Sequence, residues 1–161
     1  MSTVVYTVAD LVPHLADASM RMKILSLVPQ QKPFRFIDEI TELSADHVVG
    51  KYTFRSDEFF YAGHFPENPV TPGVILLECM AQIGLVTMAR YLLILEGKNE
   101  NLTTLFTDAQ VEFQALVLPG TEVIVRSEKT FWRRNKLKAN VTMLLKDGKI
   151  AASGTLSGMG I

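Results

Sequence analysis

The stretch that decides the fold is Gly63-His64-Phe65-Pro66-Glu67-Asn68-Pro69-Val70-Thr71-Pro72-Gly73, followed by the apolar run of residues 74–82. Proline at every third position fixes the backbone φ angle repeatedly, which predicts a stiff, extended loop. The apolar run contains no further proline and predicts a helix that begins where the loop ends. We therefore expect His64 on a rigid loop and Glu78 inside a helix.

The apolar segment continues to residue 95, which is long enough to raise the question of a membrane span. Glu78, Gln82 and Arg90 would be costly in lipid. A helix that is apolar nearly all round is also typical of one wrapped inside a protein core. The sequence therefore predicts a buried central helix and no membrane span.

Alternating apolar residues on both sides of this helix predict an antiparallel sheet. The expected strands are residues 34–40, 47–54, 105–113, 121–131, 136–146 and 149–158. Asp147-Gly148 is the strongest hairpin signal, because type I′ turns favour such pairs at positive φ. One long helix and an antiparallel sheet make an α+β domain. We expect residues 1–21 to form a peripheral extension, with a weak helix from residue 11 to 22, and residues 22–161 to form one domain.

Length and composition limit the function classes. A chain of 161 residues with 48% hydrophobic content suits one domain with a sizeable core. A net charge of −1 gives no global reason to expect a nucleic-acid partner. The single Cys79 forms no internal disulfide, and the first residues do not read as a secretory leader, so we expect a cytoplasmic protein. The sequence contains no metal-ligand cluster.

The end of the loop predicts an oxyanion site. Thr71 can serve as the N-cap with Pro72 at the first helical position, which leaves the N–H groups of Gly73 and Val74 unpaired. These donors and the positive end of the helix dipole suit a thioester oxygen that gains negative charge. A histidine and a carboxylate nearby can abstract a carbon-bound proton and protonate a departing hydroxyl. The pattern of His64, Gly73 and Glu78 therefore favours a dehydratase.

The spacing along the helix predicts a site shared by two chains. Gly73 and Glu78 differ by five positions, or about 140° in direction and about 7.5 Å along the axis. A thioester held by Gly73 beside His64 would meet the Glu78 of a second chain more easily than its own. We therefore predict a homodimer with composite sites, in which Gln82, one turn beyond Glu78, orients the carboxylate or a water.

Simpler interpretations exist for each element. His14 and His47 are expected to be structural or merely exposed, and a loop rich in proline and glycine can be no more than a rigid turn. An unpaired carboxylate inside an apolar helix is harder to explain structurally, because burying it costs several kcal/mol. The combination favours a site.

The motif Gly63-His64-Phe65-Pro66-x-x-Pro69-Val70-x-Pro72-Gly73-Val74, followed by Leu77-Glu78-x-x-Ala81-Gln82, resembles the 3-hydroxyacyl-[acyl-carrier-protein] dehydratases of the FabZ type. Pro33-Phe34, Asp38, Val111-x-Phe113 and Val117-x-Pro119-Gly120 extend the resemblance over residues 22–158. It implies the hot-dog fold, a long helix wrapped by an antiparallel sheet.

The resemblance also implies roles for individual residues. His64 acts as the base on the α-carbon, Glu78 of the partner subunit assists loss of the β-hydroxyl, and Gly73 binds the thioester carbonyl. The candidate substrate-binding residues are Gly73, Val74, Gln82 and Phe65. No cofactor or metal is implied. The implied partner is an acyl carrier protein with a phosphopantetheine-linked acyl chain, and the sequence leaves open whether the dimers form a trimer of dimers.

Two segments depart from the pattern of this family. Pro29-Gln30-Gln31-Lys32 stands where the dehydratases commonly have Pro-His-Arg-Tyr, and residues 110–115 lack the basic side chains that help to receive an acidic carrier. A replacement patch could come from Arg133, Arg134, Lys136 and Lys138, although a charged hairpin tip is more often simply solvated.

The sequence thus predicts dehydration of (3R)-3-hydroxyacyl thioesters to trans-2-enoyl thioesters, in fatty acid biosynthesis or a related polyene or polyketide-like pathway. One alternative is a hot-dog acyl thioesterase, which would use a carboxylate-activated water rather than a loop histidine. The other is a non-catalytic acyl-binding protein, which would need neither His64 nor Glu78.

Overall fold

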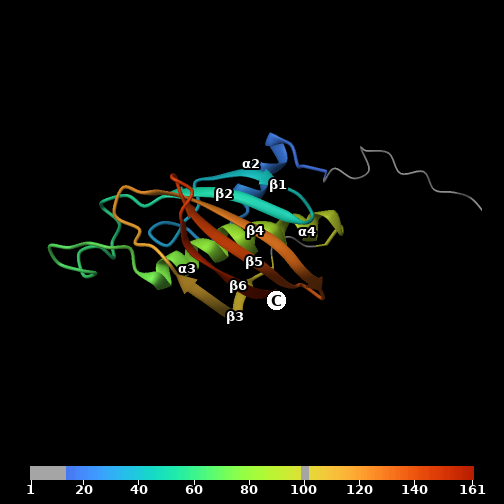
Figure 1. The fold of residues 1–161 in the computed structure, drawn as a ribbon. Coiled ribbons are helices and arrows are strands. Elements are labelled where there is room, and N and C mark those ends of the chain that lie inside the picture. Colours follow the sequence, from blue (N-terminus) through green and yellow to red (C-terminus); the bar gives the residue numbers. More distant parts are fainter. Residues whose placement is uncertain (1–13, 99–101) are drawn as a thin grey trace, which may run out of the picture.

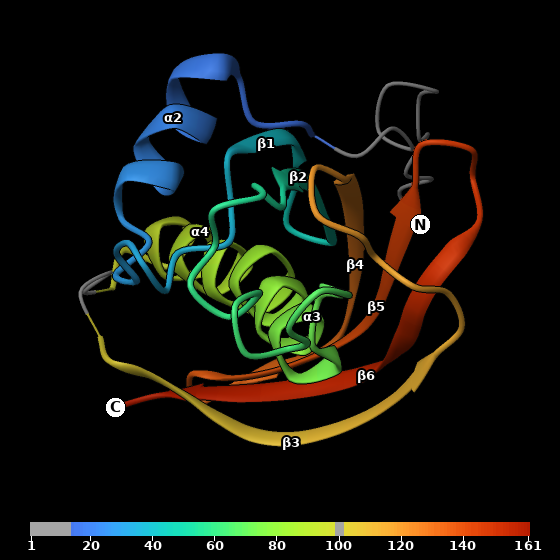
Figure 2. The same ribbon diagram turned by 90° about the vertical axis from the view of Figure 1, so that its left-hand side faces the viewer.

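A long helix crosses the hollow of a curved antiparallel sheet in the computed structural model, which describes residues 14–98 and 102–161. Figure 2 shows the sheet wrapped around the helix, with β3 on its outer edge. The described strands are β1 Glu39–Leu43, β2 His47–Thr53, β3 Thr104–Phe113, β4 Glu122–Arg133, β5 Lys136–Leu145 and β6 Ile150–Gly160. They form one sheet in the order β1-β2-β4-β5-β6-β3. The predicted hot-dog architecture is confirmed.

The central helix consists of α3 Gly73–Ala81, the π-helical turn η1 Gln82–Val86 and α4 Thr87–Leu95. Although it is long and apolar enough to cross a membrane, 78% of its most apolar stretch is buried inside the fold. The helix is therefore the core of the domain, as the sequence predicted.

Glycines let this helix approach the sheet closely. A Cβ atom on Gly84 would lie 3.1 Å from the side chain of Ser127, and one on Gly50 would lie 2.8 Å from that of Ile83. The Ser127 hydroxyl donates a hydrogen bond of 3.0 Å to the Gly84 carbonyl. The π-helical turn, which the sequence analysis did not predict, is thus anchored where the helix meets the sheet.

The strand predicted at residues 34–40 is wrong, because β1 begins only at Glu39. The Phe36 N–H donates to Oε1 of Gln82 at 2.7 Å, and the Gln82 amide donates to the Phe34 carbonyl at 3.0 Å. The buried side chain of Gln82 thus hydrogen-bonds the backbone of Phe34 and Phe36, which would otherwise pair with a neighbouring strand.

The hairpin at Asp147-Gly148 is present, but the predicted type I′ turn is wrong. That turn requires positive φ at both central residues, and of the two only Gly148, at 86°, has it. The turn with two positive φ angles is the one between β4 and β5, where Arg134 and Asn135 adopt 50° and 60°.

The first described helix, α2 Ala18–Ser26, begins with Asp17 as its N-cap. It starts later and ends later than the predicted helix at 11–22, of which residues 11–13 lie outside the described residues. Its Ile24 is fully buried in the core. The predicted boundary between residues 21 and 22 falls within α2, and a separate role for residues 1–21 stays a prediction.

Candidate active site

His64 is held by the backbone of its own loop. Its Nδ1 lies 2.9 Å from the Val70 carbonyl, and the Val70 N–H donates to the His64 carbonyl at 3.0 Å. Because a carbonyl oxygen only accepts, Nδ1 must carry the hydrogen, which leaves the lone pair of Nε2 free in the neutral ring. The ring stacks on Phe65 with centroids 4.1 Å apart. This arrangement fixes the orientation of the ring, and the role of His64 as a general base stays a prediction.

Thr71 ties the end of the loop to the rest of the domain. Its N–H donates to the Val117 carbonyl at 2.9 Å, and its hydroxyl lies 2.6 Å from the Tyr61 hydroxyl. Burial raises the pKa of Tyr61, so its hydroxyl stays protonated at neutral pH. The prediction of Thr71 as N-cap is wrong, since Pro72 takes that position and makes no side-chain cap. The Thr71 side chain is engaged by Tyr61 instead.

The helix start offers the predicted donors. Ile75 and Leu76 are the first residues of α3 that donate to the Pro72 carbonyl, at 2.9 and 3.1 Å. The N–H groups of Gly73 and Val74 therefore precede the helical ladder, where an acceptor can reach them. A Cβ atom on Gly73 would lie 3.3 Å from the Phe113 ring, so a side chain here would displace that ring.

Glu78 is fixed by a side-chain network inside the fold. The Gln82 amide donates to Oε1 of Glu78 at 2.9 Å. Gln82 is 0% exposed, and its amide oxygen and nitrogen also bond the backbone at Phe36 and Phe34. Gln82 thus bonds both the carboxylate and the backbone, and its role in orienting Glu78 stays a prediction.

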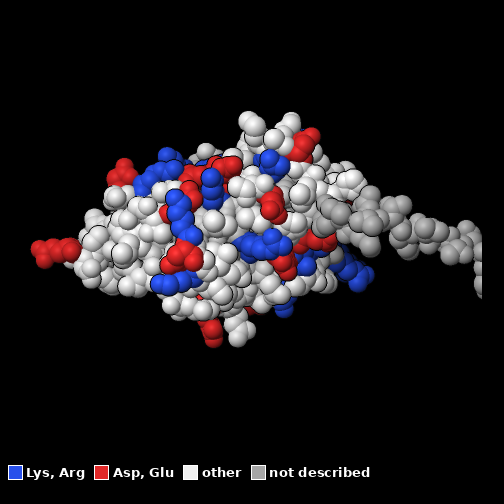
Figure 3. Space-filling model, turned by 45° about the horizontal axis from the view of Figure 1, so that its top comes forward, with Lys and Arg blue, Asp and Glu red and all other residues white. Residues whose placement is uncertain are grey.

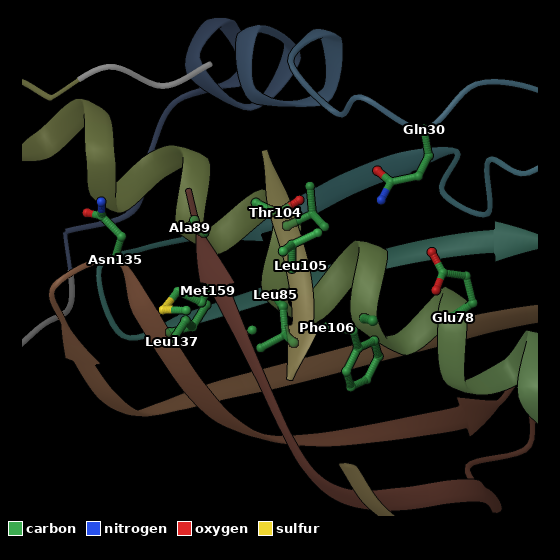
Figure 4. A pocket seen from close by; sticks show the side chains of 14 residues that line it. Gln30, Glu78, Leu85, Ala89, Thr104, Leu105, Phe106, Asn135, Leu137 and Met159 are labelled. Carbon is green, nitrogen blue, oxygen red and sulfur yellow. The ribbon is translucent and has the colours of Figure 1, made fainter. Parts of the chain in front are cut away.

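A cavity of about 130 Å³ runs beside the central helix from Glu78. Small residues line part of it, Ala81 and Ala89 on the helix and Gly158 and Gly160 on β6. Figure 4 shows Glu78 and Gln30 at one end of this cavity and Asn135 at the other. The cavity is therefore an elongated space that starts at a carboxylate.

His64, Gly73, Val74 and Phe65 do not line this cavity. Within the chain, Gln82 bonds Glu78, but of the two only Glu78 lines the cavity, and His64 and Gly73 lie outside it. The separation follows from the helix, because Glu78 and Gly73 point to different sides of it.

Gln30 is a site residue that the sequence analysis did not identify as such. It lines the cavity together with Glu78, and its Oε1 is buried without a hydrogen-bond partner among the described residues. Only its position in the segment that departs from the dehydratase pattern could have drawn attention to it. Within residues 14–98 and 102–161, no cluster of three or more His, Cys, Asp or Glu side chains could hold a metal ion.

Comparisons with known proteins agree on one family. Residues 28–155 match the family model of the FabA-like domain. The 3-hydroxyacyl-[acyl-carrier-protein] dehydratase FabZ of Streptococcus uberis is 35% identical over 136 residues, which cover 83% of this chain and 92% of that protein. The FabZ of Caldicellulosiruptor bescii is 32% identical over 136 residues, covering 83% and 93%.

Solved structures share the fold at much lower identity. The dehydratase heterocomplex ApeI:P from Xenorhabdus doucetiae superposes with a TM-score of 0.73 at 14% identity, over 86% of this chain and 90% of that one. Zebra fish thioesterase superfamily member 2 gives 0.62 at 12% identity, over 88% and 95%. Both dehydratases and thioesterases therefore use this architecture, and the fold alone does not choose between them.

Proposed function

The chain belongs to the FabA-like family, and we propose that it is a 3-hydroxyacyl-[acyl-carrier-protein] dehydratase whose active sites combine His64 of one protomer with Glu78 of its partner. The substrate is a (3R)-3-hydroxyacyl thioester and the product is the trans-2-enoyl thioester. The observation that carries the proposal is the His64 ring, whose Nδ1 is bonded to the Val70 carbonyl so that Nε2 is free to act as a base.

The proposed reaction is an elimination of water. Nε2 of His64 takes a proton from the α-carbon, and the thioester oxygen gains negative charge. The N–H groups of Gly73 and Val74 donate to that oxygen at the positive end of the helix dipole. Glu78 gives a proton to the β-hydroxyl, which leaves as water while the double bond forms. The proton then on His64 returns to Glu78 through solvent, so that both groups are reset.

Two observations support a composite site. Glu78 lines the cavity whereas His64 and Gly73 do not, which favours a partner that brings the base to the carboxylate. The strand β3 is also an exposed edge, and its Leu105, Phe106 and Phe113 are 46%, 42% and 50% exposed. Proteins rarely leave a long apolar edge strand uncovered. A second copy pairing along β3 would cover it, and a trimer of such dimers would leave this contact intact.

Gln30 extends the proposed site. Its unpartnered Oε1 lies in the same cavity as Glu78, where it can accept a hydrogen bond from the β-hydroxyl of the substrate. We expect Gln30 to orient the hydroxyl toward Glu78 before protonation. Gln82 acts on the substrate through Glu78, because its amide contacts the Glu78 carboxylate and the backbone.

The face in Figure 3 carries acidic and basic side chains side by side, so it offers no broad basic surface to an acidic carrier. We therefore expect the carrier to dock on a local basic patch. Arg133, Arg134 and Lys136 surround a shallow depression with Phe131 and Met159. Cations around an apolar floor suit an acidic carrier protein or the phosphate of its prosthetic group. Lys138 does not line this depression. A carrier-bound substrate and a single buried cysteine both fit the predicted cytoplasmic location.

The test is dehydration of a 3-hydroxyacyl carrier protein, followed by mass spectrometry, with wild type, His64→Ala and Glu78→Gln. Both variants should lose water elimination, and the proposal fails if a folded wild-type dimer turns over no chain on any carrier. Release of free carrier thiol instead of an enoyl product would indicate a thioesterase.

Mixing the two inactive variants tests the composite site. In a mixed dimer one site loses both residues and the other keeps both, so random exchange restores about a quarter of the wild-type activity. If His64 and Glu78 acted within one protomer, every site in the mixture would lack one of them. Activity that stays at background after subunit exchange would therefore exclude the composite site.

A further inference from the structure

The cavity beside the central helix starts at the residue that is proposed to act on the β-hydroxyl. A hydroxyl that Glu78 protonates places the β-carbon of the substrate at this end, so the remaining carbons need an apolar space that begins here. The cavity offers such a space, because most of the side chains that line it are apolar. These are Ala81, Leu85, Val86, Ala89, Leu105, Phe106, Leu137 and Met159.

The helix side of the lining ends at an alanine. Ala89 lies eleven positions beyond Glu78, which corresponds to about 16 Å along the helix. One turn further, Leu92 and Leu93 are 5% and 1% exposed, and neither of them lines the cavity. Among the described residues, Ala89 is therefore the last helix residue of the lining, at the point where a small side chain gives way to leucine.

The length and the volume of this space give similar limits for an acyl chain. An extended chain spans about 3.6 Å for every three bonds, so about 16 Å corresponds to about 13 carbons beyond the β-carbon. The volume of about 130 Å³ holds about 9–13 groups of the size of a water molecule, at about 10–15 Å³ for each group, and a methylene is of similar size. Adding the three carbons at the thioester end gives chains of about 12–16 carbons.

The far end of the cavity suits hydrocarbon less well than its middle. Asn135 lines this end, and Figure 4 shows it beyond Ala89 as seen from Glu78. Covering an amide with hydrocarbon costs free energy, because its hydrogen-bonding groups lose the partners that water provides. An acyl chain therefore gains little by extending past Ala89.

We propose that Ala89 determines the length of the acyl chain, and that the preferred substrates are 3-hydroxyacyl thioesters of about 12–16 carbons. The inference rests on the proposed dehydratase function and names its substrate class. The methyl group of Ala89 leaves the passage open where the tail of such a chain ends. A larger side chain at this position would occupy the space of the last carbons, whereas short chains end near Glu78 and do not reach it.

The experiment compares pantetheine thioesters of increasing length, so that carrier docking does not enter. The panel contains 3-hydroxybutyryl, 3-hydroxyoctanoyl, 3-hydroxydodecanoyl, 3-hydroxyhexadecanoyl and 3-hydroxyoctadecanoyl, each below its critical micelle concentration. With the wild type, kcat/KM should rise by about tenfold or more from the first to the third, because each further methylene is buried in the cavity. It should not rise further beyond 3-hydroxyhexadecanoyl.

Substitution of Ala89 tests its role. Ala89→Leu should lower the ratio of kcat/KM for 3-hydroxyhexadecanoyl to that for 3-hydroxybutyryl by about tenfold, because the added carbons fill the passage. Unfolded protein lowers both values alike, so the ratio reports the folded fraction alone. Ala89→Val adds fewer atoms, should lower the ratio less, and replaces the leucine variant if that variant does not fold. Ala18→Leu is the matched control and should keep the wild-type ratio, since Ala18 is exposed on α2 and does not line the cavity.

The outcomes separate the two proposals. Equal kcat/KM of the wild type for all chain lengths, or an unchanged ratio in the folded Ala89 variants, would overturn the inference and leave the dehydratase intact. Such a result would mean that the acyl chain does not extend along this cavity to Ala89. If the wild type turned over no thioester, 3-hydroxybutyryl included, on pantetheine or on a carrier protein, the proposed function would be overturned and this inference with it.

Discussion

The loop that carries His64 and the helix turn that carries Glu78 both fix a titratable side chain, but they do so over very different sequence distances. His64 is bonded to the carbonyl of Val70, six residues away. Glu78 is held by Gln82, which is itself bonded to Phe36 and Phe34 across 46 and 48 residues. The first arrangement is local and the second is part of the core. Changes to the His64 side chain should therefore affect catalysis alone, whereas changes around Glu78 should affect catalysis and stability together.

The largest expected effect is the loss of the loop base. His64→Ala should lower kcat by a factor on the order of 10²–10⁴, the usual contribution of a general base. Among the described residues, the ring bonds Val70 and stacks on Phe65, both in its own loop, so the melting temperature should stay close to that of the wild type. Steady-state kinetics and calorimetry on the same preparation would check both expectations.

His47 offers the matched control, since it is a histidine with a structural environment. It is 9% exposed, with Nδ1 3.0 Å from the Ser44 hydroxyl and Nε2 2.9 Å from Glu42. His47→Ala should destabilise the domain by about 1–2 kcal/mol while kcat of the folded fraction stays unchanged. The distinction between loop and core would be lost if the two histidine variants behaved alike.

The next effect concerns the network behind Glu78. Gln82→Glu keeps an acceptor for the Phe36 N–H but removes the donor to Glu78 and to Phe34, and it places a second carboxylate beside the first. We expect kcat to fall by about tenfold with little change in KM, and the free energy of unfolding to fall by about 1–3 kcal/mol. Denaturant titration and kinetics would measure both. A variant with unchanged kcat would remove Gln82 from the positioning network.

The same contrast explains which features the sequence could predict. The Gly73 helix start is local, and it predicted the backbone N–H groups that precede the helical ladder. The extended loop expected from the proline spacing was wrong, because the chain turns back between Phe65 and Asn68, whose backbone groups bond each other. The strand at residues 34–40 was wrong because its backbone pairs with Gln82, a contact that no local pattern encodes. Most residues that line the cavity come from the helix, from β3 and β6 and from the turn before β5, so its lining could not be predicted before the sheet order was known.

A smaller effect should follow from loosening the anchor of the loop. Tyr61→Phe removes the hydroxyl that lies 2.6 Å from that of Thr71 and leaves the ring in the aromatic core. The expected loss is about 1 kcal/mol in the free energy of unfolding, with a smaller decrease in kcat than Gln82→Glu causes. Thr71→Val removes the other partner, and equal effects of the two single variants and their combination would show that they report one bond.

The smallest expected effect concerns Cys79, which lies on the core-facing side of the helix turn that also carries Glu78. Cys79 follows Glu78 directly, yet it is fully buried in the core, and this burial raises the pKa of its thiol well above 9.0. In the unfolded chain the thiol ionises at its ordinary pKa, so above that pH the unfolded state binds fewer protons than the folded state. Stability should therefore fall as the pH rises beyond about 9, by the linkage between protonation and folding.

Burial also raises the pKa values of Tyr52 and Tyr61, but these groups contribute only above pH 10, where free tyrosine ionises. Cys79→Ala should lower stability slightly at neutral pH and flatten the decline between pH 9 and 10, measured by denaturant unfolding at each pH. If the slope is unchanged in this variant, the pKa of the thiol is the same in the folded and unfolded states. The core-facing side of this helix turn would then be less buried than the structure indicates.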